Sequence, residues 1–208
     1  ACTNNGRCQD VCPPYLSGKT LSPRQLIQSL RVYTSERGPV LASVKTGEEA
    51  PPPQKDMISY VDPTAVWDCL TCRACMEACP VFIEHIDSIV DMRRNLVMEQ
   101  AQMPETAMGA LLSMEQRGHP WRGTTLTRES WTEGLGDVPI FDGSQEYLYW
   151  VGCSGALVER NLPITKAVFR LLREAGASFG VLGQEETCSG DPARRLGNEY
   201  LYQTLVFQ

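Results

Sequence analysis

Cysteine is the residue type in this sequence whose number and spacing point to chemistry. The nine cysteines fall in three places, namely Cys2, Cys8 and Cys12, then Cys69, Cys72, Cys75 and Cys79, and finally Cys153 and Cys188. Disulfide, zinc and iron–sulfur chemistry each need sulfurs in a different arrangement. The spacing therefore indicates which of these chemistries the chain supports.

The middle group follows the pattern Cys-x2-Cys-x2-Cys-x3-Cys-Pro from Cys69 to Pro80. This is the spacing of bacterial ferredoxin motifs. Three thiolates separated by two residues can surround one cubane cluster, whereas the fourth cysteine, turned away by the proline, binds a different cluster. The pattern therefore predicts a second motif elsewhere in the chain.

That second motif lies at the N-terminus, where Cys2, Asn5, Cys8 and Cys12-Pro13 repeat the same frame with asparagine in the second position. Crossed ligation then predicts two clusters. Cluster A takes Cys2, Cys8 and Cys79, and cluster B takes Cys12, Cys69, Cys72 and Cys75.

Asn5 leaves one corner of cluster A open, because an amide is a weak ligand for a soft iron–sulfide centre. A 3Fe-4S cluster with a vacant corner is one outcome, and it resembles the pattern in succinate dehydrogenase iron–sulfur subunits. A 4Fe-4S cluster whose odd iron takes Asn5, water or another group is the second. In the third outcome, Asn5 is an ordinary loop residue that says nothing about ligation, and cluster A never assembles.

Two other cysteine chemistries fit poorly. Structural zinc sites use two cysteine pairs separated by a dozen or more residues, unlike the closely spaced triple here. Disulfide frameworks are typical of small secreted chains, and this one has 208 residues. Iron–sulfur chemistry is favoured over both.

Cys153 and Cys188 are each followed by Ser-Gly and each comes after a predicted strand. The carboxyl ends of parallel strands share one edge of a sheet, where α/β proteins place their sites. The two cysteines are therefore predicted to form half of a site. Free cysteines that simply pack in a core are the alternative that composition leaves open.

Helices are predicted to position the first two cysteine groups. Ser22-Pro23 is typical of a helix start, and Leu26, Ile27 and Leu30 share one face after it. Further amphipathic helices are predicted over 83–97 and over 105–116, and Gly118 stops the second of these. Residues 46–56 are predicted to form a surface connection.

The pattern changes after residue 145. A buried strand is predicted over 147–151 and a second strand over 179–182. A helix from Pro163 to Gly176 is predicted between them. Another helix is predicted to begin at Asp191 and to be still running at Gln208. The first of these helices carries an apolar face of Ile164, Ala167, Val168, Leu171 and Leu172. The expected fold class is thus α + α/β: a helical dicluster ferredoxin-like domain (1–117), a linker (118–145) and an incomplete α/β domain (146–208).

Composition limits the class of protein. Hydrophobic residues make up 42% and charged residues 21%, which is typical of a folded globular chain. The net charge of -6 provides no basic surface for nucleic acid. The sequence contains no apolar run long enough to span a membrane, no signal peptide and no initiator Met, so we expect a fragment or a processed chain.

The sequence also resembles a known family. The runs 149–153 (YWVGC) and 186–199 (ETCSGDPARRLGNE) resemble the first half of the cysteine-rich CCG domain of heterodisulfide reductases and of glycolate oxidase and anaerobic glycerol-3-phosphate dehydrogenase iron–sulfur subunits. The first third resembles the same superfamily in 6–9 (GRCQ), 21–24 (LSPR), 67–75 (WDCLTCRAC) and 80–85 (PVFIEH). Membrane-anchored members of the type that links electron-transfer flavoprotein to quinone are the most similar.

This resemblance implies an iron–sulfur electron-transfer subunit, peripheral at the cytoplasmic face of the membrane, with a flavoprotein donor, other subunits of a membrane redox complex and an indirect link to quinone. Ser189 replaces the second cysteine of the family's paired motif, and the later C-x2-C half is absent. A further cluster at Cys153 and Cys188 is therefore left open. The alternatives are a heterodisulfide or thiol reductase-type subunit with a catalytic cluster there, and a structural metal-binding scaffold.

Four further residues are given structural roles. His85 and His119 are predicted to be hydrogen-bonding or solvated side chains rather than ligands. Arg93 and Arg94 are predicted to lie on a solvated helix face.

Overall fold

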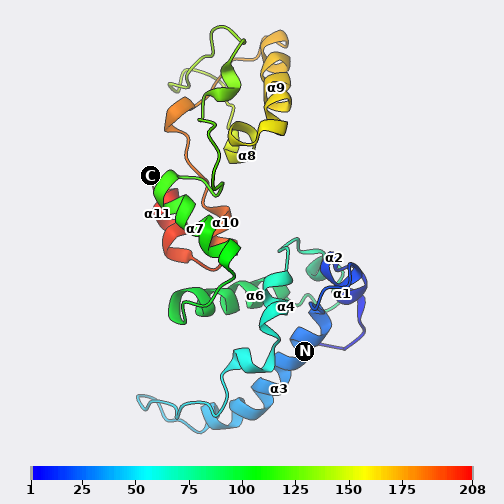
Figure 1. The fold of residues 1–208 in the computed structure, drawn as a ribbon. Coiled ribbons are helices and arrows are strands. Elements are labelled where there is room, and N and C mark those ends of the chain that lie inside the picture. The colour runs from blue at the N-terminus through cyan, green and yellow to red at the C-terminus, as the bar shows by residue number, and fades with distance from the viewer. Residues whose placement is uncertain (1, 208) are drawn as a thin grey trace. The chain divides into compact units, whose positions relative to one another are not determined.

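The computed structural model describes residues 2–207 and is mostly helical, with one small parallel sheet (Figure 1). The chain divides into two compact units, residues 1–102 and 103–208. Each unit has a hydrophobic core of its own. Within the described residues, no helix combines the length and the apolar character needed to cross a membrane.

The first unit consists of short helices around one long one. Its elements are α1 (Arg7–Asp10), α2 (Pro13–Leu16), α3 (Pro23–Ala42), the 3-10 helix η1 (Met57–Tyr60), α4 (Pro63–Asp68), α5 (Ala74–Glu77), α6 (His85–Arg94) and the π-helix η2 (Asn95–Glu99). The hydroxyl of Ser22 accepts a hydrogen bond from the Gln25 N–H at 3.1 Å, and Pro23 is the first residue of α3. The predicted helix start is therefore confirmed.

The core of this unit joins segments that are far apart in the sequence. Leu26 on α3, Val66 on α4 and both Ile89 and Met92 on α6 are buried against one another. Full burial of each such side chain contributes roughly 1.5–3 kcal/mol. The core thereby fixes α4 and α6 on either side of the second cysteine motif, while 46–56 carries no helix or strand, as predicted.

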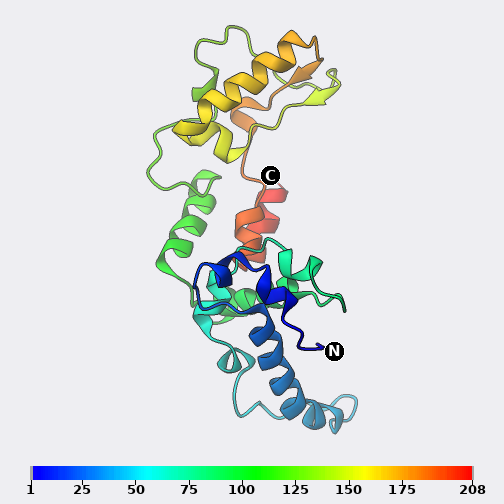
Figure 2. The ribbon, with the colours of Figure 1, turned by 90° about the vertical axis from the view of Figure 1, so that its right-hand side faces the viewer.

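The second unit combines helices with the sheet. Its elements are α7 (Glu105–Arg117), η3 (Ser130–Thr132), β1 (Tyr147–Leu148), α8 (Gly152–Leu157), η4 (Glu159–Asn161), α9 (Leu162–Glu174), β2 (Phe179–Gly180), η5 (Gly183–Glu185), α10 (Asp191–Arg195) and α11 (Glu199–Val206). Strands β1 and β2 are parallel and α9 runs between them in the sequence, as predicted. In Figure 2, α9 lies alongside the two strands. α7 ends at Gly118, whose φ of 65° is left-handed, again as predicted.

The exposure of β1 and the face of α9 that packs on the core both differ from the prediction. β1 is only two residues long, and Tyr147 and Leu148 are 53% and 40% exposed, so the prediction of a buried strand over 147–151 is wrong. On α9, Ile164 and Leu171 are 62% and 69% exposed, whereas Phe169 is buried. The ring of Phe169 packs edge-to-face on Phe179 and Trp131, and this aromatic contact decides which face of α9 meets the core.

The segment 118–145 contributes to the core of the second unit. Trp131 and Leu135 are buried there, and the ring of Trp131 also contacts Tyr149. The division between the compact units falls before α7 rather than within this segment. The assignment of 1–117, 118–145 and 146–208 to separate domains stays a prediction.

The C-terminal helix is interrupted. α10 ends at Arg195, and Asn198 begins α11 by accepting a hydrogen bond from the Leu201 N–H at 2.9 Å. Gly197 lies between them with a φ of 90°, which no helix adopts. The prediction of one helix running from Asp191 is therefore wrong.

Candidate metal centre

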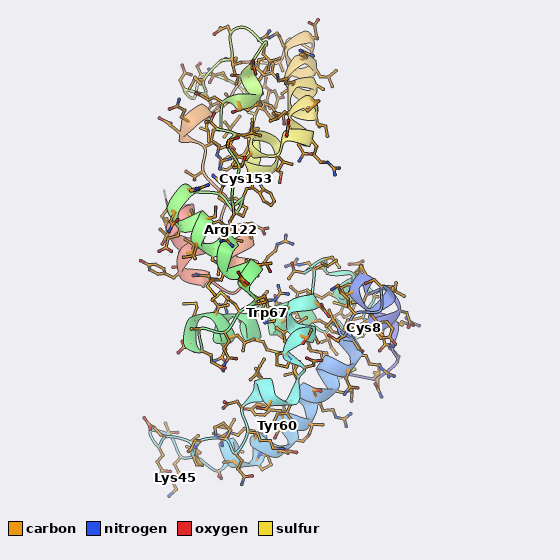
Figure 3. All side chains as sticks on the ribbon, viewed as in Figure 1. Cys8, Lys45, Tyr60, Trp67, Arg122 and Cys153 are labelled. Carbon is orange, nitrogen blue, oxygen red and sulfur yellow. The ribbon has the colours of Figure 1, made fainter. Side chains whose placement is uncertain are left out.

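Three cysteines of the first unit lie together, and we call them cysteine group A: Cys2, Cys8 and Cys79. Burial raises the pKa of the Cys8 thiol, and negative charge on Cys2 or Cys79 raises it further. A small cavity is lined by all three, together with Asn5, Arg24 and His85. Cys8, labelled in Figure 3, lies on the short helix α1. The structure thus brings Cys79 to the N-terminal motif.

The other four lie together as cysteine group B: Cys12, Cys69, Cys72 and Cys75. Burial raises the pKa of Cys75 to about 12, and the charges of Cys69, Cys12 and Cys72 contribute in that order. Burial also raises the pKa of Cys69, again with contributions from Cys12 and Cys72. Cys12 therefore lies with the second motif, although its sequence position is in the first.

The two motifs have the same backbone conformation. Asn4 and Thr71, at equivalent positions, have φ angles of 57° and 53°, and Gly6 and Arg73 have 86° and 67°. Such left-handed residues are uncommon outside glycine. A short helix follows directly in both motifs, α1 in the first and α5 in the second. Asn5 therefore occupies the position in its turn that Cys72 occupies in the other.

Backbone N–H groups surround the sulfurs. At 3.3 Å each, Asn4 N–H donates to Cys2 Sγ, Thr71 N–H to Cys69 Sγ and Ile83 N–H to Cys79 Sγ. The N–H groups of Tyr15 and Met76 also lower the pKa of Cys12 and Cys75, against the stronger effect of burial. Each of these contacts favours the thiolate, the form that binds metal.

The side chain of Asn5 takes part in its own turn. Its Nδ2 donates to Thr3 Oγ1 and its Oδ1 accepts from the Arg7 N–H, both at 3.1 Å. These bonds stabilise the turn of the N-terminal motif, although no thiolate occupies position 5. The amide nevertheless lines the cavity of group A.

Arg93 is a residue whose role the sequence did not reveal. The prediction of a solvated side chain is wrong, because Arg93 is only 4% exposed. Its guanidinium donates to the carbonyl oxygens of Val66 and Cys69, each at 2.7 Å from Nη2, and Nη2 also lies 3.3 Å from the carbonyl of Trp67. Its charge lowers the pKa of Cys69, opposing burial. Arg94 is half-buried rather than fully solvated, and its guanidinium pairs with Asp91.

Both histidines are at least half-buried. His85 Nδ1 lies 2.8 Å from the carbonyl oxygen of Ile83, and since that oxygen only accepts, Nδ1 carries the proton. Burial lowers the pKa of His85. Burial also lowers the pKa of His119, and the charges of Arg128 and Arg117 contribute. The structural roles of both histidines stay predictions.

Cys153 and Cys188 meet in the second unit. Cys153 lies on α8 and Cys188 lies between η5 and α10 (Figure 3 labels Cys153). The interaction between the two thiols lowers the pKa of Cys153 and raises that of Cys188. The sulfur of Cys188 also lies 4.0 Å from Met114 Sδ. The structure thus brings together the two cysteines that the sequence predicted to be close.

A buried ion pair borders these two thiols. Arg128 Nη1 lies 2.9 Å from Glu186 Oε1, and Arg128 Nη2 lies 3.2 Å from Cys153 Sγ. Glu186 also accepts from the backbone N–H groups of Val151 and Gly152. Sequence reasoning missed this pair, because the two residues are far apart in the chain and belong to no motif.

The donor set fits iron–sulfur clusters. Soft thiolates with backbone N–H donors around them are the ligands that such clusters require, and four of these seven cysteines are buried. Within residues 2–207, no three His, Cys, Asp or Glu side chains are arranged to hold a single metal ion. Thiolates around a cubane bind different irons, so they are spread more widely than the ligands of one ion.

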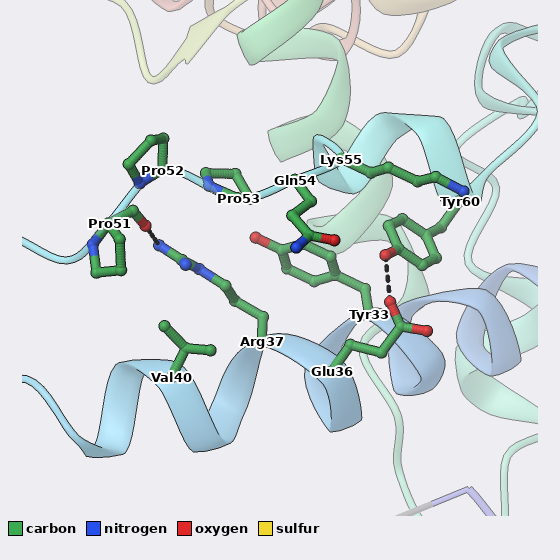
Figure 4. A pocket seen from close by; sticks show the side chains of 10 residues that line it. All are labelled: Tyr33, Glu36, Arg37, Val40, Pro51, Pro52, Pro53, Gln54, Lys55 and Tyr60. Carbon is green, nitrogen blue, oxygen red and sulfur yellow. Dashed lines mark hydrogen bonds between the residues drawn. The ribbon is translucent and has the colours of Figure 1, made fainter.

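A separate cavity of about 730 Å³ lies between α3 and residues 51–60 (Figure 4). Tyr33, Arg37 and Tyr60 line it, and the hydroxyl of Tyr60 donates to the carboxylate of Glu36. Its lining contains no cysteine. It is therefore not part of either cysteine group.

Comparison with known proteins agrees with this donor set. Residues 1–83 match the model of the 4Fe-4S dicluster domain. The chain is 42% identical over its whole length to EtfAB:quinone oxidoreductase of Syntrophomonas wolfei, covering 32% of that protein. It is 35% identical over 99% of its length to the probable iron-sulfur-binding oxidoreductase FadF of Bacillus subtilis, covering 34% of it.

A more distant relative belongs to the dihydromethanophenazine:CoB–CoM heterodisulfide reductase of Methanosarcina barkeri. This component of the reductase is 28% identical over 97% of the present chain, which covers 48% of its length. The chain spans about a third of the length of the first two relatives. No solved structure matches the chain.

Proposed function

Since this chain is a homologue of iron–sulfur electron-transfer oxidoreductases and carries a 4Fe-4S dicluster domain at residues 1–83, we propose that it relays single electrons between a flavoprotein donor and a quinone-linked partner. The observation that carries the proposal is the separation of seven cysteines into groups A and B, each drawing on both motifs. When bound, iron–sulfur clusters supply one-electron transfer.

We assign the ligands by group. Cys2, Cys8 and Cys79 hold cluster A, and Cys12, Cys69, Cys72 and Cys75 hold cluster B. The mutual effects of these thiols on each other's pKa support this crossed assignment. The pKa is raised for Cys8, Cys12, Cys69 and Cys75, so these four thiols stay protonated in the metal-free chain and release protons when a cluster binds.

Cluster A has three thiolate ligands in this proposal. It holds three irons if the corner at Asn5 stays vacant, and four if Asn5, water or another group completes it. The shared backbone conformation of the two motifs supports the view that this corner is preformed.

The names of two relatives support our proposal for the partners and the location of the chain. The name of one relative couples EtfAB to quinone, and another, 36% identical, is named a probable membrane-anchored ferredoxin of Chromohalobacter salexigens. We therefore place the chain in a membrane redox complex, peripheral at the cytoplasmic face. Its donor is a flavoprotein, and it reaches quinone through another subunit or domain.

Electron paramagnetic resonance of anaerobically purified protein, first oxidised and then reduced with dithionite, tests the electron-transfer role. We expect signals from two clusters, with iron and acid-labile sulfide present in matching amounts. Stoichiometric zinc, or metal without sulfide, would instead identify a structural metal-binding scaffold.

A second candidate function is suggested by the contact between Cys153 and Cys188. In this alternative the second unit is the first half of a CCG-type α/β domain and holds a further cluster, as in a heterodisulfide or thiol reductase. Two thiolates are too few for a cubane, so other ligands must complete it. A third paramagnetic signal that disappears in Cys153→Ser, while the other two persist, would favour this alternative.

A further inference from the structure

The arginine–carboxylate pair beside Cys153 has no role in the functions proposed above. We propose that Arg128 is a positioning residue of the Cys153–Cys188 site, which fixes the Cys153 sulfur and places a positive charge against it. Glu186 holds Arg128 in place and reduces the effect of its charge. The inference rests on the proposed site at these two cysteines but not on which metal or substrate they meet.

Three hydrogen bonds fix the guanidinium of Arg128. Nη1 donates to Glu186 Oε1 at 2.9 Å, and Nη2 donates to the carbonyl oxygen of Gly118 at 3.2 Å and to Cys153 Sγ at 3.2 Å. The planar guanidinium directs its donors along fixed lines. With two other acceptors satisfied, one N–H is aimed at the sulfur.

Glu186 links the same arginine to the backbone that carries Cys153. Its side chain is only 3% exposed. Oε2 accepts from the Val151 N–H at 3.0 Å and Oε1 from the Gly152 N–H at 2.9 Å. These two residues lead directly into α8, so one carboxylate orients both the start of that helix and the arginine that meets its sulfur.

The surroundings make this charge effective. Arg128 is 12% exposed at its side chain, and charges in such a setting are screened far less than at the surface. Cys188 is buried, whereas Cys153 is partly accessible. Cys153 is therefore the sulfur that an external reagent or ligand reaches first, and it meets that reagent with an N–H of the Arg128 guanidinium donating to it.

The reactivity of Cys153 tests the proposal. Wild-type and variant chains are purified anaerobically and treated with iodoacetamide near neutral pH, and modified Cys153 and Cys188 are quantified by peptide mass spectrometry. Arg128→Met should slow the modification of Cys153 about tenfold, and Arg128→Lys, which keeps the charge, should recover part of that loss. Glu186→Gln should speed it about threefold, because the carboxylate no longer offsets the arginine.

The opposite directions separate this role from a merely structural one. If the pair only maintained the fold, both variants would change the reactivity of Cys153 in the same direction, and that result would overturn the proposal. The proposal would also be overturned if Cys153 were modified by iodoacetamide at the same rate in Arg128→Met as in wild type, or if it were equally unreactive in both. Arg170→Met, at an exposed position of α9, is the matched control and should leave the rate unchanged.

Paramagnetic spectra of the same samples keep the two proposals apart. If the cluster signals of the first unit persist while the reactivity of Cys153 ignores Arg128, only the positioning role fails. If the wild-type chain shows no cluster signals, the electron-transfer function fails whatever the reactivity of Cys153.

Discussion

At the scale of single residues, Asn5 distinguishes the two cysteine motifs. The backbone around it repeats the turn around Cys72, including a left-handed residue on either side. The two turns also share an N–H to sulfur bond at 3.3 Å, made by Asn4 in one and Thr71 in the other. The difference between these two turns therefore lies in one side chain and not in the path of the backbone.

Asn5→Cys should supply the missing thiolate of cluster A. Because the turn already has the conformation that presents Cys72, the new sulfur needs little rearrangement. We expect four irons at cluster A in the variant, with a lower reduction potential than in wild type, since a thiolate adds negative charge to the cluster. Iron analysis, paramagnetic spectra and a redox titration measure this.

Asn5→Ser is the matched control, because it changes the same position without adding a soft ligand. Its cluster A should keep the wild-type iron content. Identical spectra and potentials in wild type and Asn5→Cys would show that position 5 does not face the cluster.

At the scale of elements, Arg93 connects α6 to the turn that carries Cys69. It leaves the last turn of α6 and binds backbone carbonyls near the end of α4 and at Cys69, the first cysteine of the second motif. Its guanidinium also lies over the ring of Trp67, 5.3 Å from the centroid. One buried side chain thus holds α4, α6 and the turn that carries Cys69 in fixed positions relative to one another.

Arg93→Met should weaken both the fold and cluster B. The carbonyls of Val66 and Cys69 would lose a charged donor inside the protein, which costs roughly 2–4 kcal/mol of unfolding free energy. Chemical denaturation measures that loss, and we expect less iron in cluster B than in cluster A. Arg31, at an exposed position of α3, gives the control Arg31→Met, which should change stability by less than about 0.5 kcal/mol.

Local signals in the sequence predicted several elements well. Ser22-Pro23 begins α3 and Gly118 ends α7 because caps act within a few residues. The same applies to the cysteine motifs, whose spacing alone indicates their chemistry. The path of the chain through Gly197 was missed because a lone glycine, without a breaker pattern, does not stop an expected helix.

Long-range contacts outside the cysteine pattern could not be predicted from the sequence. The burial of Trp131 depends on Phe169 and Tyr149, which no pattern near residue 131 announces. Arg93 looked like half of an exposed pair because its acceptors lie on another helix. The partners of Cys153 were hidden in the same way, since Arg128 comes from a glycine-rich segment that resembled a linker.

At the scale of the whole molecule, the proposed crossed ligation would tie distant segments together. Cys12→Ala should abolish cluster B, although Cys12 belongs to the first motif, and should leave cluster A in place. The reason is that Cys12 lies with Cys69 and Cys75 in group B. Paramagnetic spectra of the reduced Cys12→Ala variant test this expectation. The control variant Cys153→Ala should keep both cluster signals. Loss of cluster A alone would mean that each motif binds its own cluster.

Removal of the clusters should destabilise one unit of the molecule and spare the other. Groups A and B both lie within residues 1–102, and the core around Trp131 lies within 103–208. Metal-binding free energy contributes directly to the folding of the unit that supplies the ligands. Clusters also close long loops, so their loss returns conformational entropy to the unfolded chain.

Differential scanning calorimetry should therefore show two transitions in the loaded protein. After anaerobic removal of iron, we expect the transition of the first unit to fall by more than about 10 °C, or to vanish, because a domain of this size shifts about 4–8 °C for each kcal/mol lost. Phe169→Ala identifies the other transition, since removing that buried ring costs about 3–5 kcal/mol in the second unit only. A single transition that moves as a whole on iron removal would show instead that the two units unfold as one.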